Sequence, residues 1–274
     1  MQKLMINELV ENLVINQSED YELIIDSQQK LNCSIHIEEH VNCSLILIAS
    51  NVREMDVKLY CGAYSQVNLF VMNETKEKLE IVNHSVVDEE SSLILSFAEF
   101  NEAETKIESV VELSGYGASC HMNSALLSKT EKHLVMTIHH KVSNTHSYMN
   151  HSGVLLEGGK LYIDATGKID KGAKGSKSHQ KSRALTFDQP KSATVLPQLL
   201  IDENDVEASH ATSVGQIDEN QMYYLQSRGL TRAEATQLIT LGALMPIAEV
   251  LNDIDLKAQM KNKIEAKVNE VCSM

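Results

Sequence analysis

The chain has 274 residues, of which 43% are hydrophobic; this composition allows a sizeable core and excludes wholesale disorder. Tryptophan is absent and phenylalanine numbers only 4, so Val, Ile, Leu, Met and Ala must fill most of that core. The formal net charge of −14 argues against a protein that binds duplex nucleic acid.

The chain shows no sequence signal for a membrane or for secretion. Its longest uncharged apolar stretch, residues 238–248, has eleven residues and contains a proline, whereas a spanning helix needs roughly twenty. The N-terminal residues lack an apolar run followed by a small-residue cleavage site. The 5 cysteines have no CxxC spacing, which argues against a disulfide framework and a classical zinc site. We therefore expect a cytoplasmic protein without membrane contact.

Residues 22–200 alternate between apolar and polar side chains, as in Leu31, Cys33, Ile35 and Ile37. This period of two predicts short strands that each bury one face, separated by polar turns. Aromatic residues are scarce, the strands recur at short intervals, and small or β-branched residues fill the inward positions. These features favour a β-solenoid over a sandwich or a barrel, and the lack of a strict repeat predicts an irregular β-helix.

The period changes to that of helices at Asp218, an N-cap candidate for a helix that ends at Gly229. A capping box at Thr231 predicts a second helix, which Pro246 kinks or restarts. A last helix is predicted from about residue 253 to 270, where apolar residues recur at helical spacing. The sequence therefore predicts a mainly β chain that ends in a small group of helices.

The predicted organisation is a β-helix core over residues 1–216 and a C-terminal helical domain over residues 217–274. The helices carry more apolar residues than a thin bundle can hide, including Tyr223, Tyr224, Leu238, Leu244 and Met245. Exposed apolar patches mark interaction sites, so we expect this surface to dock a partner protein.

The sequence contains 11 histidines, and six of them lie between residues 121 and 151. Adjacent residues of a strand point to opposite faces, so neither His139 with His140 nor Cys120 with His121 can face one ion. We therefore expect no metal cluster built here by a single chain. The basic stretch 160–191 is interpreted as a solvated loop, with contact to an acidic partner as the alternative.

No motif in the chain assigns a reaction. A glycine-rich phosphate loop, a GxSxG elbow and an HExxH helix are all absent from the sequence. The chain is therefore expected to have no enzymatic turnover of its own.

From about residue 110 to its end, the chain resembles the SufB/SufD family of iron–sulfur cluster assembly proteins. The resemblance is carried by a Pro-x-Leu-x-Ile stretch, a DVxxSH motif, a VGxLD step and a YLxSRG ending, in this order. In this sequence they correspond to Pro197–Ile201, Asp205–Thr212, Val214–Asp218 and Tyr224–Leu230. Residues 113–118, 139–142, 153–155 and 179–183 add support upstream.

The resemblance implies a right-handed parallel β-helix followed by C-terminal helices that dock a SufC-like ABC ATPase in the cytosol. It also implies that a SufB-like and a SufD-like subunit pair through their β-helices, with a transient iron–sulfur cluster forming between them. His210 matches the SufD-type histidine implicated at that interface, as a candidate metal ligand or proton carrier. Cys120 is the best-placed candidate thiol, with a buried apolar role as its alternative.

Two departures make the chain more similar to SufD than to SufB. SufB-type chains have glutamate directly after this histidine, whereas this chain has Ala211. They also have a cysteine ahead of the Pro-x-Leu stretch, where this chain has none between residues 189 and 194. The family's N-terminal helical domain is not recognisable, so a second copy of the chain stays open as the partner besides a SufB-like paralogue.

The leading hypothesis is a scaffold subunit of a SUF-type assembly complex with its ATPase. A homodimeric minimal SufB-like scaffold that carries the cluster itself is one alternative. Another is a purely structural partner of the ATPase. The rival from a different class, a β-helix enzyme acting on acidic polysaccharide, would call for a secretory signal.

Overall fold

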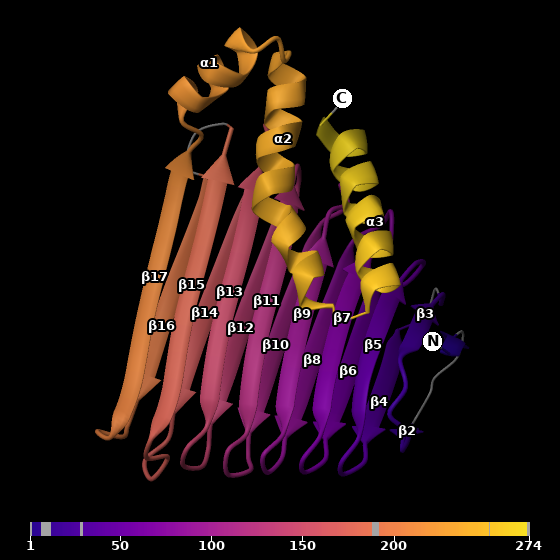
Figure 1. The fold of residues 1–274 in the computed structure, drawn as a ribbon, viewed down its shortest axis with the longest axis vertical. Helices are drawn as coiled ribbons and strands as arrows, with labels where there is room; N and C mark the ends of the chain where they lie inside the picture. Colours follow the sequence, from indigo (N-terminus) through magenta and orange to yellow (C-terminus); the bar gives the residue numbers. More distant parts are fainter. Residues whose placement is uncertain (1, 7–11, 28–29, 188–191, 252, 273–274) are drawn as a thin grey trace.

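The computed structural model describes residues 2–6, 12–27, 30–187, 192–251 and 253–272 (Figure 1). In them the chain forms two sheets, which we call sheet A, with nine strands, and sheet B, with eight. Odd-numbered strands form sheet A and even-numbered strands form sheet B. The strands are β1 (Gln2–Ile6), β2 (Leu13–Ile15), β3 (Tyr21–Ile25), β4 (Leu31–Ile37), β5 (Asn42–Ala49), β6 (Glu54–Cys61), β7 (Gln66–Asn73), β8 (Leu79–Val87), β9 (Ser92–Glu99), β10 (Thr105–Leu113), β11 (Ser119–Ser128), β12 (Glu131–His140), β13 (His146–Leu155), β14 (Lys160–Ile169), β15 (Ser176–Thr186), β16 (Ala193–Ile201) and β17 (Val206–Gln216).

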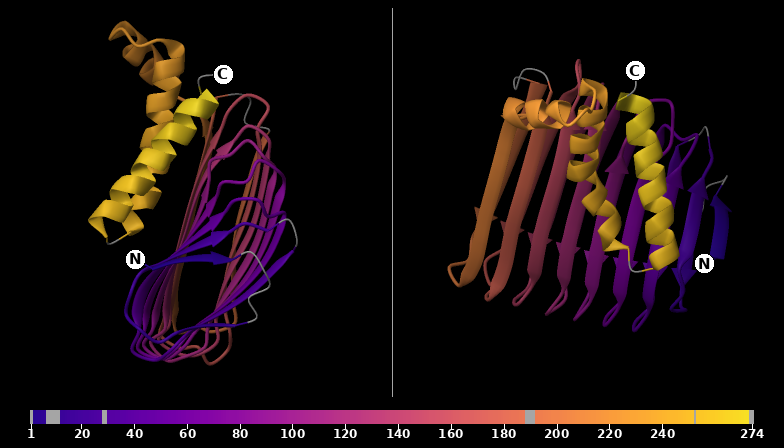
Figure 2. Two further views of the ribbon diagram at one scale, coloured as in Figure 1. Left: turned by 90° about the vertical axis from the view of Figure 1, so that its right-hand side faces the viewer. Right: turned by 45° about the horizontal axis from the view of Figure 1, so that its top comes forward.

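Each coil of the chain adds one strand to sheet A and one to sheet B. Neighbouring strands within a sheet pair in parallel, as β11 does with β13 and β12 with β14. The coils lie side by side along one axis, and the two sheets face each other across a narrow interior (Figures 1 and 2). The β-solenoid predicted from the alternating pattern is therefore confirmed.

The interior of the solenoid is mainly aliphatic. In β4, Leu31, Cys33, Ile35 and Ile37 are buried, whereas the residues between them are more exposed. Successive coils repeat this alternation, so their inward side chains stack into one apolar cluster between the sheets. A core this thin is filled by aliphatic side chains, which accounts for the scarcity of large aromatic residues.

The strands give way to helices α1 (Glu219–Ser227), α2 (Arg232–Leu244), η2 (Met245–Val250), a 3₁₀ helix, and α3 (Ile254–Cys272). The side chain of Asp218 caps α1, and Thr231 with Glu234 forms the capping box of α2, as predicted. Pro246 lies at the start of η2, where α2 has ended. Among the described residues, no helix is long and apolar enough to cross a bilayer.

Helices α2, η2 and α3 lie against the outer face of sheet A (Figures 1 and 2). Strands β5 and β7 are consequently buried on both faces, which the alternating pattern does not predict. The shared cluster includes Ile46, Ile48, Phe70, Met72 and Phe100 from the sheet and Leu244, Ile247, Leu256, Met260 and Ile264 from the helices. The boundary predicted after residue 216 coincides with the end of β17, but the division into two domains stays a prediction.

The basic stretch interpreted as a solvated loop is largely regular structure, so that interpretation is wrong. Residues 160–169 form β14 and residues 176–186 form β15. Small or apolar inward side chains, such as those of Ala165 and Ser178, alternate with outward basic ones. This alternation of buried and exposed residues is the period of two expected of a strand. Among the described residues of this stretch, the turn between the two strands, which contains Gly172 and Gly175 at positive φ, fits the loop interpretation, and residues 188–191 lie outside the described residues.

Candidate functional site

The solenoid ends at strands β16 and β17, and we call this uncovered last coil the open end. Within the described chain, β16 pairs only with β14, and β17 only with β15. An edge strand presents unpaired backbone N–H and C=O groups and so is a template for pairing with another chain. Apolar side chains add to this surface, because Leu196, Leu200, Ile201 and Val214 are 36–51% exposed. The open end is therefore suited to binding a second sheet.

His210 lies in the middle of β17, where its Cα pairs with that of Gln180 in β15. Paired residues of parallel strands point to the same face, and Gln180 is buried inside the solenoid. His210 thus occupies the inward position of the last coil, and it is exposed because no further described coil covers it. Its side chain has no hydrogen-bond partner among the described residues. In the described part of the chain, His210 makes no side-chain hydrogen bond to the turn before Asp218, which follows the end of β17 at Gln216.

The interior below His210 is polar on the side of sheet A. Gln180 and Ser182 of β15 are buried, and Ser182 pairs with buried His151 of β13. Among the described residues, Gln180 Oε1, Ser182 Oγ and His151 Nε2 are buried without a hydrogen-bond partner. Buried polar atoms are nearly always bonded in folded proteins, so three unpartnered ones this close together call for an explanation.

Cys120 does not lie at the open end. It belongs to β11, three strands from β17 in the order of sheet A, and its side chain is fully buried in the aliphatic core. Burial raises the pKa of the Cys120 thiol far above its ordinary value, so the thiol stays protonated and is a poor metal ligand. The structure therefore does not bring Cys120 and His210 together, although a role for Cys120 in assembly is not tested by this geometry.

The other thiols are not better placed. Burial raises the pKa of Cys33 to about 11 and that of Cys43 to about 12, and it raises the pKa of fully buried Cys61 as well. Cys272 is partly exposed, but it lies at the end of α3, which packs on the outer face of sheet A. No cysteine of the described residues is thus both exposed and part of the open end.

The histidine-rich segment is divided between the two faces of the strands. His140 is buried and its ring nitrogens lie 2.8 Å from Thr145 Oγ1 and from Ser147 Oγ. His139 faces outward instead, with Nε2 2.7 Å from Asp170 Oδ2. The part of the chain that the structure describes contains no group of three or more His, Cys, Asp or Glu arranged to hold a metal ion.

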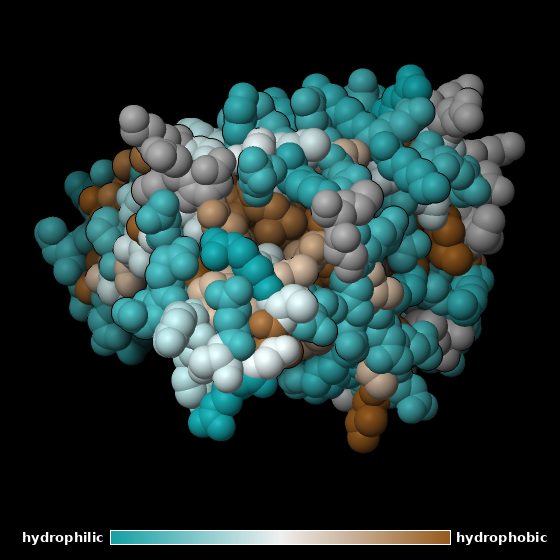
Figure 3. Space-filling view, turned by 90° about the horizontal axis from the view of Figure 1, so that it is seen from above, coloured by the Kyte–Doolittle hydropathy of each residue, from teal (hydrophilic) through white to brown (hydrophobic). Residues whose placement is uncertain are grey.

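A second candidate surface lies on helices α1 and α2. Tyr223, Tyr224 and Leu238 are 74%, 55% and 52% exposed, and the Arg228 guanidinium lies 5.2 Å from the centre of the Tyr224 ring. A groove of about 370 Å³ lies next to them, lined by residues of both helices and of β15, including Leu225 and Leu238. Seen from above, the molecule shows hydrophobic side chains grouped in a hollow among hydrophilic ones (Figure 3).

Two of the five predicted docking residues, Leu244 and Met245, pack toward sheet A and not toward this exposed surface. Leu244 is wholly buried in the cluster between the helices and sheet A, so the prediction that it docks a partner through an exposed side chain is wrong. Met245 is partly buried and packs against the same cluster. Both belong to the helical face that covers the sheet, which the sequence alone could not distinguish from a face open to solvent.

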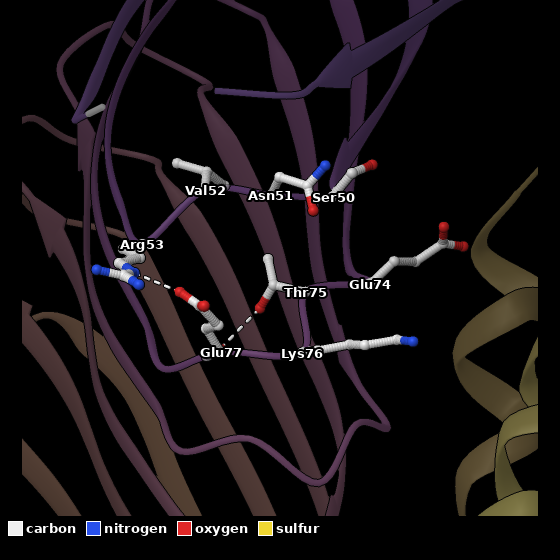
Figure 4. Close-up of a pocket in the computed structure, with 8 residues that line it drawn as sticks. All are labelled: Ser50, Asn51, Val52, Arg53, Glu74, Thr75, Lys76 and Glu77. Atoms are coloured by element: carbon white, nitrogen blue, oxygen red, sulfur yellow. Dashed lines mark hydrogen bonds and ion pairs between the residues drawn. The ribbon is translucent and has the colours of Figure 1, made fainter. Parts of the chain in front are cut away.

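A separate hollow, of about 530 Å³, lies between the β5–β6 and β7–β8 turns (Figure 4). Its charges are balanced, since it is lined by Arg53 and Lys76 and by Glu74 and Glu77. Arg53 forms an ion pair with Glu77, and Glu74 accepts from Lys263 of α3 over 2.7 Å. Since Glu74 and Glu77 are both in ion pairs, the described lining of this hollow offers no unpaired carboxylate for a cation.

Residues 17–243 match the model of a family described as "SUF system FeS cluster assembly, SufBD core domain". The chain belongs to the SufBD family. This SufBD chain is 33% identical over 170 residues to the iron–sulfur cluster assembly protein SufD of Bacillus subtilis (strain 168), a match that covers 61% of the chain and 39% of that protein. The family of the SUF system expected from the sequence motifs is thereby confirmed.

Two further relatives are named as iron–sulfur cluster assembly SufBD family proteins. That of Mycobacterium bovis is 37% identical over 112 residues, which cover 41% of this SufBD chain and 13% of the relative. That of Staphylococcus saprophyticus is 28% identical over 112 residues, which cover 24% of the relative. The matches with these three relatives thus span less than half of each relative's length.

The polar patch below His210 was not predicted from the sequence. Ser176, Ser178, Gln180 and Ser182 stand at alternate positions of β15, and Ser178 and Ser182 pair with the buried polar residues Ser147 and His151 of β13. These polar residues at alternate positions are visible in the sequence, but the same pattern is expected on the solvent-exposed face of a strand. Only the register with β13 and β17 shows that it faces the interior.

Proposed function

We propose that this SufBD chain is a scaffold subunit for iron–sulfur cluster assembly and that it pairs through its open end with a second β-solenoid. The observation that carries the proposal is the position of His210, exposed at an inward site of an unpaired edge strand. A second solenoid that continues the sheets would enclose this imidazole at the interface. A neutral imidazole is a good ligand for iron, and it can also carry a proton near neutral pH.

The partner is proposed to be a SufB-like paralogue. Iron–sulfur clusters are held mainly by thiolates, and no described cysteine of this chain is both exposed and at the open end. A second copy of the chain would therefore bring another His210 but no thiolate. The thiolates are expected from a different subunit, with the nascent cluster as cargo of the interface rather than a resident cofactor.

A SufC-like ABC ATPase is proposed as the further partner, docked on α1 and α2. Large aromatic side chains dominate many interfaces, and Tyr223 and Tyr224 are exposed on α1, where their side chains do not join the buried cluster around Met222. The chain itself is proposed to have no turnover. A purely structural role, in which the chain holds the ATPase without contacting a cluster, is the alternative that the first experiment addresses.

His210→Ala is expected to fold and to bind its partner subunits normally but to lose most of its activity in cluster formation. The substitution removes a side chain that has no hydrogen-bond partner among the described residues, so stability should hardly change. Reconstituted complexes are assayed for thermal stability, for subunit association and for cluster absorbance. His179→Ala is the matched control, because His179 lies on the neighbouring strand β15 but faces outward, with its Nδ1 2.8 Å from Ser209 Oγ. Full cluster formation by His210→Ala would contradict the proposed role of His210 and favour the alternative, in which the chain holds the ATPase without contacting a cluster.

Tyr224→Ala and Leu238→Ala are each expected to weaken binding of the ATPase about tenfold or more, which corresponds to about 1.4 kcal/mol. Both side chains are exposed, so the monomer should keep its stability. Binding is measured by calorimetry with the purified ATPase. Val82→Ala is the control, since Val82 is 45% exposed but lies on β8 of sheet B, which the helices do not cover. Unchanged affinity in both helix variants would exclude this docking surface.

A further inference from the structure

Gln180, the residue directly below His210, has its side-chain amide fixed in one orientation. It is 3% exposed, and its Nε2 donates a hydrogen bond of 2.8 Å to the backbone oxygen of Gln198 in β16. A carbonyl oxygen only accepts, so the nitrogen of the amide must face Gln198 and Oε1 must face elsewhere. Among the described residues, Oε1 is buried and has no partner.

The backbone across the interior holds this amide in place. Gly167 of β14 lies opposite, and a Cβ at that position would stand 3.0 Å from Gln180 Nε2 and 2.5 Å from Ser178 Oγ. The glycine therefore gives the amide the room it occupies between the two sheets. With Gln198 on one side and Gly167 on the other, Gln180 has little freedom to turn its oxygen away.

His210 is the nearest inward residue of the next coil. Its Cα pairs with that of Gln180, and neighbouring strands are about 4.8 Å apart, so the two side chains are stacked neighbours. The structure contains no hydrogen bond between them, so a ring N–H of His210 would meet the unpaired Oε1 only when the exposed ring turns toward it. An unpaired buried acceptor is unfavourable. Two donor-bearing groups lie near Oε1: His210, which pairs with Gln180 in the next coil, and Ser182 of the same strand, whose buried Oγ has no partner among the described residues.

We propose that Gln180 is a positioning residue for His210. Its Oε1 accepts a hydrogen bond from one ring N–H and so selects the tautomer whose other nitrogen is free toward the open end. The bond made by one ring nitrogen decides which nitrogen is available as a ligand, and such outer partners orient metal-binding histidines. The use of the free nitrogen in cluster assembly rests on the proposed function, whereas the hydrogen bond itself does not.

The test is the tautomer ratio of His210, measured by NMR on the full chain labelled with ¹⁵N in histidine. The signal is assigned by its loss in His210→Ala. In the wild type we expect one tautomer to predominate, and in Gln180→Met, which has similar length but no acceptor oxygen, we expect the ratio to change at least about threefold.

Ser182→Ala is the matched control, since Ser182 is an inward residue of the same strand that pairs with Thr212 rather than with His210. It should leave the ratio unchanged. If Gln180→Met fails to fold, Gly167→Ala takes its place, because the added Cβ displaces the amide and should change the ratio in the same direction. An unchanged ratio in a folded Gln180→Met or Gly167→Ala chain would overturn the proposal and assign Oε1 to a buried water instead.

The outcomes also separate this inference from the proposed function. The NMR measurement needs neither a partner subunit nor a cluster. A changed tautomer ratio together with normal cluster formation by His210→Ala would support the positioning role and refute the function proposed for His210. An unchanged ratio together with loss of cluster formation in His210→Ala would refute the positioning role of Gln180 and support the function proposed for His210.

Discussion

Replacing Lys132 with alanine is expected to lower the free energy of unfolding by about 3–5 kcal/mol, because it leaves the buried Glu99 without a counter-charge. Both side chains are fully buried, and Lys132 Nζ lies 3.7 Å from Glu99 Oε2. Nζ also donates to Asn101 Oδ1 and to the oxygen of Ala103, each over 2.6 Å, and to Thr105 Oγ1 over 2.9 Å. Burial raises the pKa of Glu99 and lowers that of Lys132, while their mutual attraction opposes both shifts.

The effect should be large because this network joins successive coils at the corner between the sheets. Asn73, at the end of β7, donates to Glu99 Oε2 over 2.9 Å, and Glu99 ends β9. Stability is measured by urea denaturation followed by circular dichroism. Lys129→Ala is the control, since its ion pair with Glu102 is partly exposed and should contribute less than about 1 kcal/mol.

A second substitution identifies the cause. Glu99→Gln, added to Lys132→Ala, removes the uncompensated charge and should recover part of the lost stability. A Lys132→Ala chain within 1 kcal/mol of the wild type would show that Glu99 takes up a proton in the folded state at little cost.

Acidification from about pH 6.5 to about pH 4 is expected to destabilise the fold by about 3 kcal/mol for each of His140 and His151. Burial lowers the pKa of both side chains to about 4, and His146 and His139 contribute to the shift of His140. Between these pH values the unfolded chain binds a proton at each position and the folded chain does not, so stability falls as the pH falls. Each unit of pKa difference corresponds to about 1.4 kcal/mol.

The measurement is the free energy of unfolding at several pH values in this range. His151→Gln should flatten the pH dependence by the contribution of one histidine, because glutamine does not titrate there. His121→Gln is the control, since His121 belongs to the neighbouring strand β11 but is exposed. If the wild type and His151→Gln lose stability in parallel, the acid sensitivity does not come from this buried imidazole.

Helices α2 and α3 limit how docking of an ATPase can be tested. Removing residues 217–274 would uncover Ile46, Phe70 and other side chains of the outer face of sheet A. A large newly exposed apolar face promotes aggregation, so loss of binding by such a truncated chain would not identify a docking site. Point substitutions at exposed positions of α1 and α2 leave that face covered.

The local sequence pattern by itself determined the secondary structure and the class of fold. Alternation such as that of Leu31, Cys33, Ile35 and Ile37 can bury one face only in a strand, and repeated short strands without large aromatic residues suit a thin stacked core. The caps at Asp218 and Thr231 are likewise local, because their hydrogen bonds join residues within one turn of helix. The motif around His210 was sufficient to indicate the SufBD family.

Only the tertiary structure decided which faces are covered. The outward residues of β5 and β7 are apolar because helices from the other end of the chain pack on them, and that contact also buries Leu244. The register of β15 with β17 decided that Gln180 lies below His210, although thirty positions separate them in the sequence. The physical reason is that burial depends on which segments meet in space, whereas periodicity reports only which residues of one segment share a face.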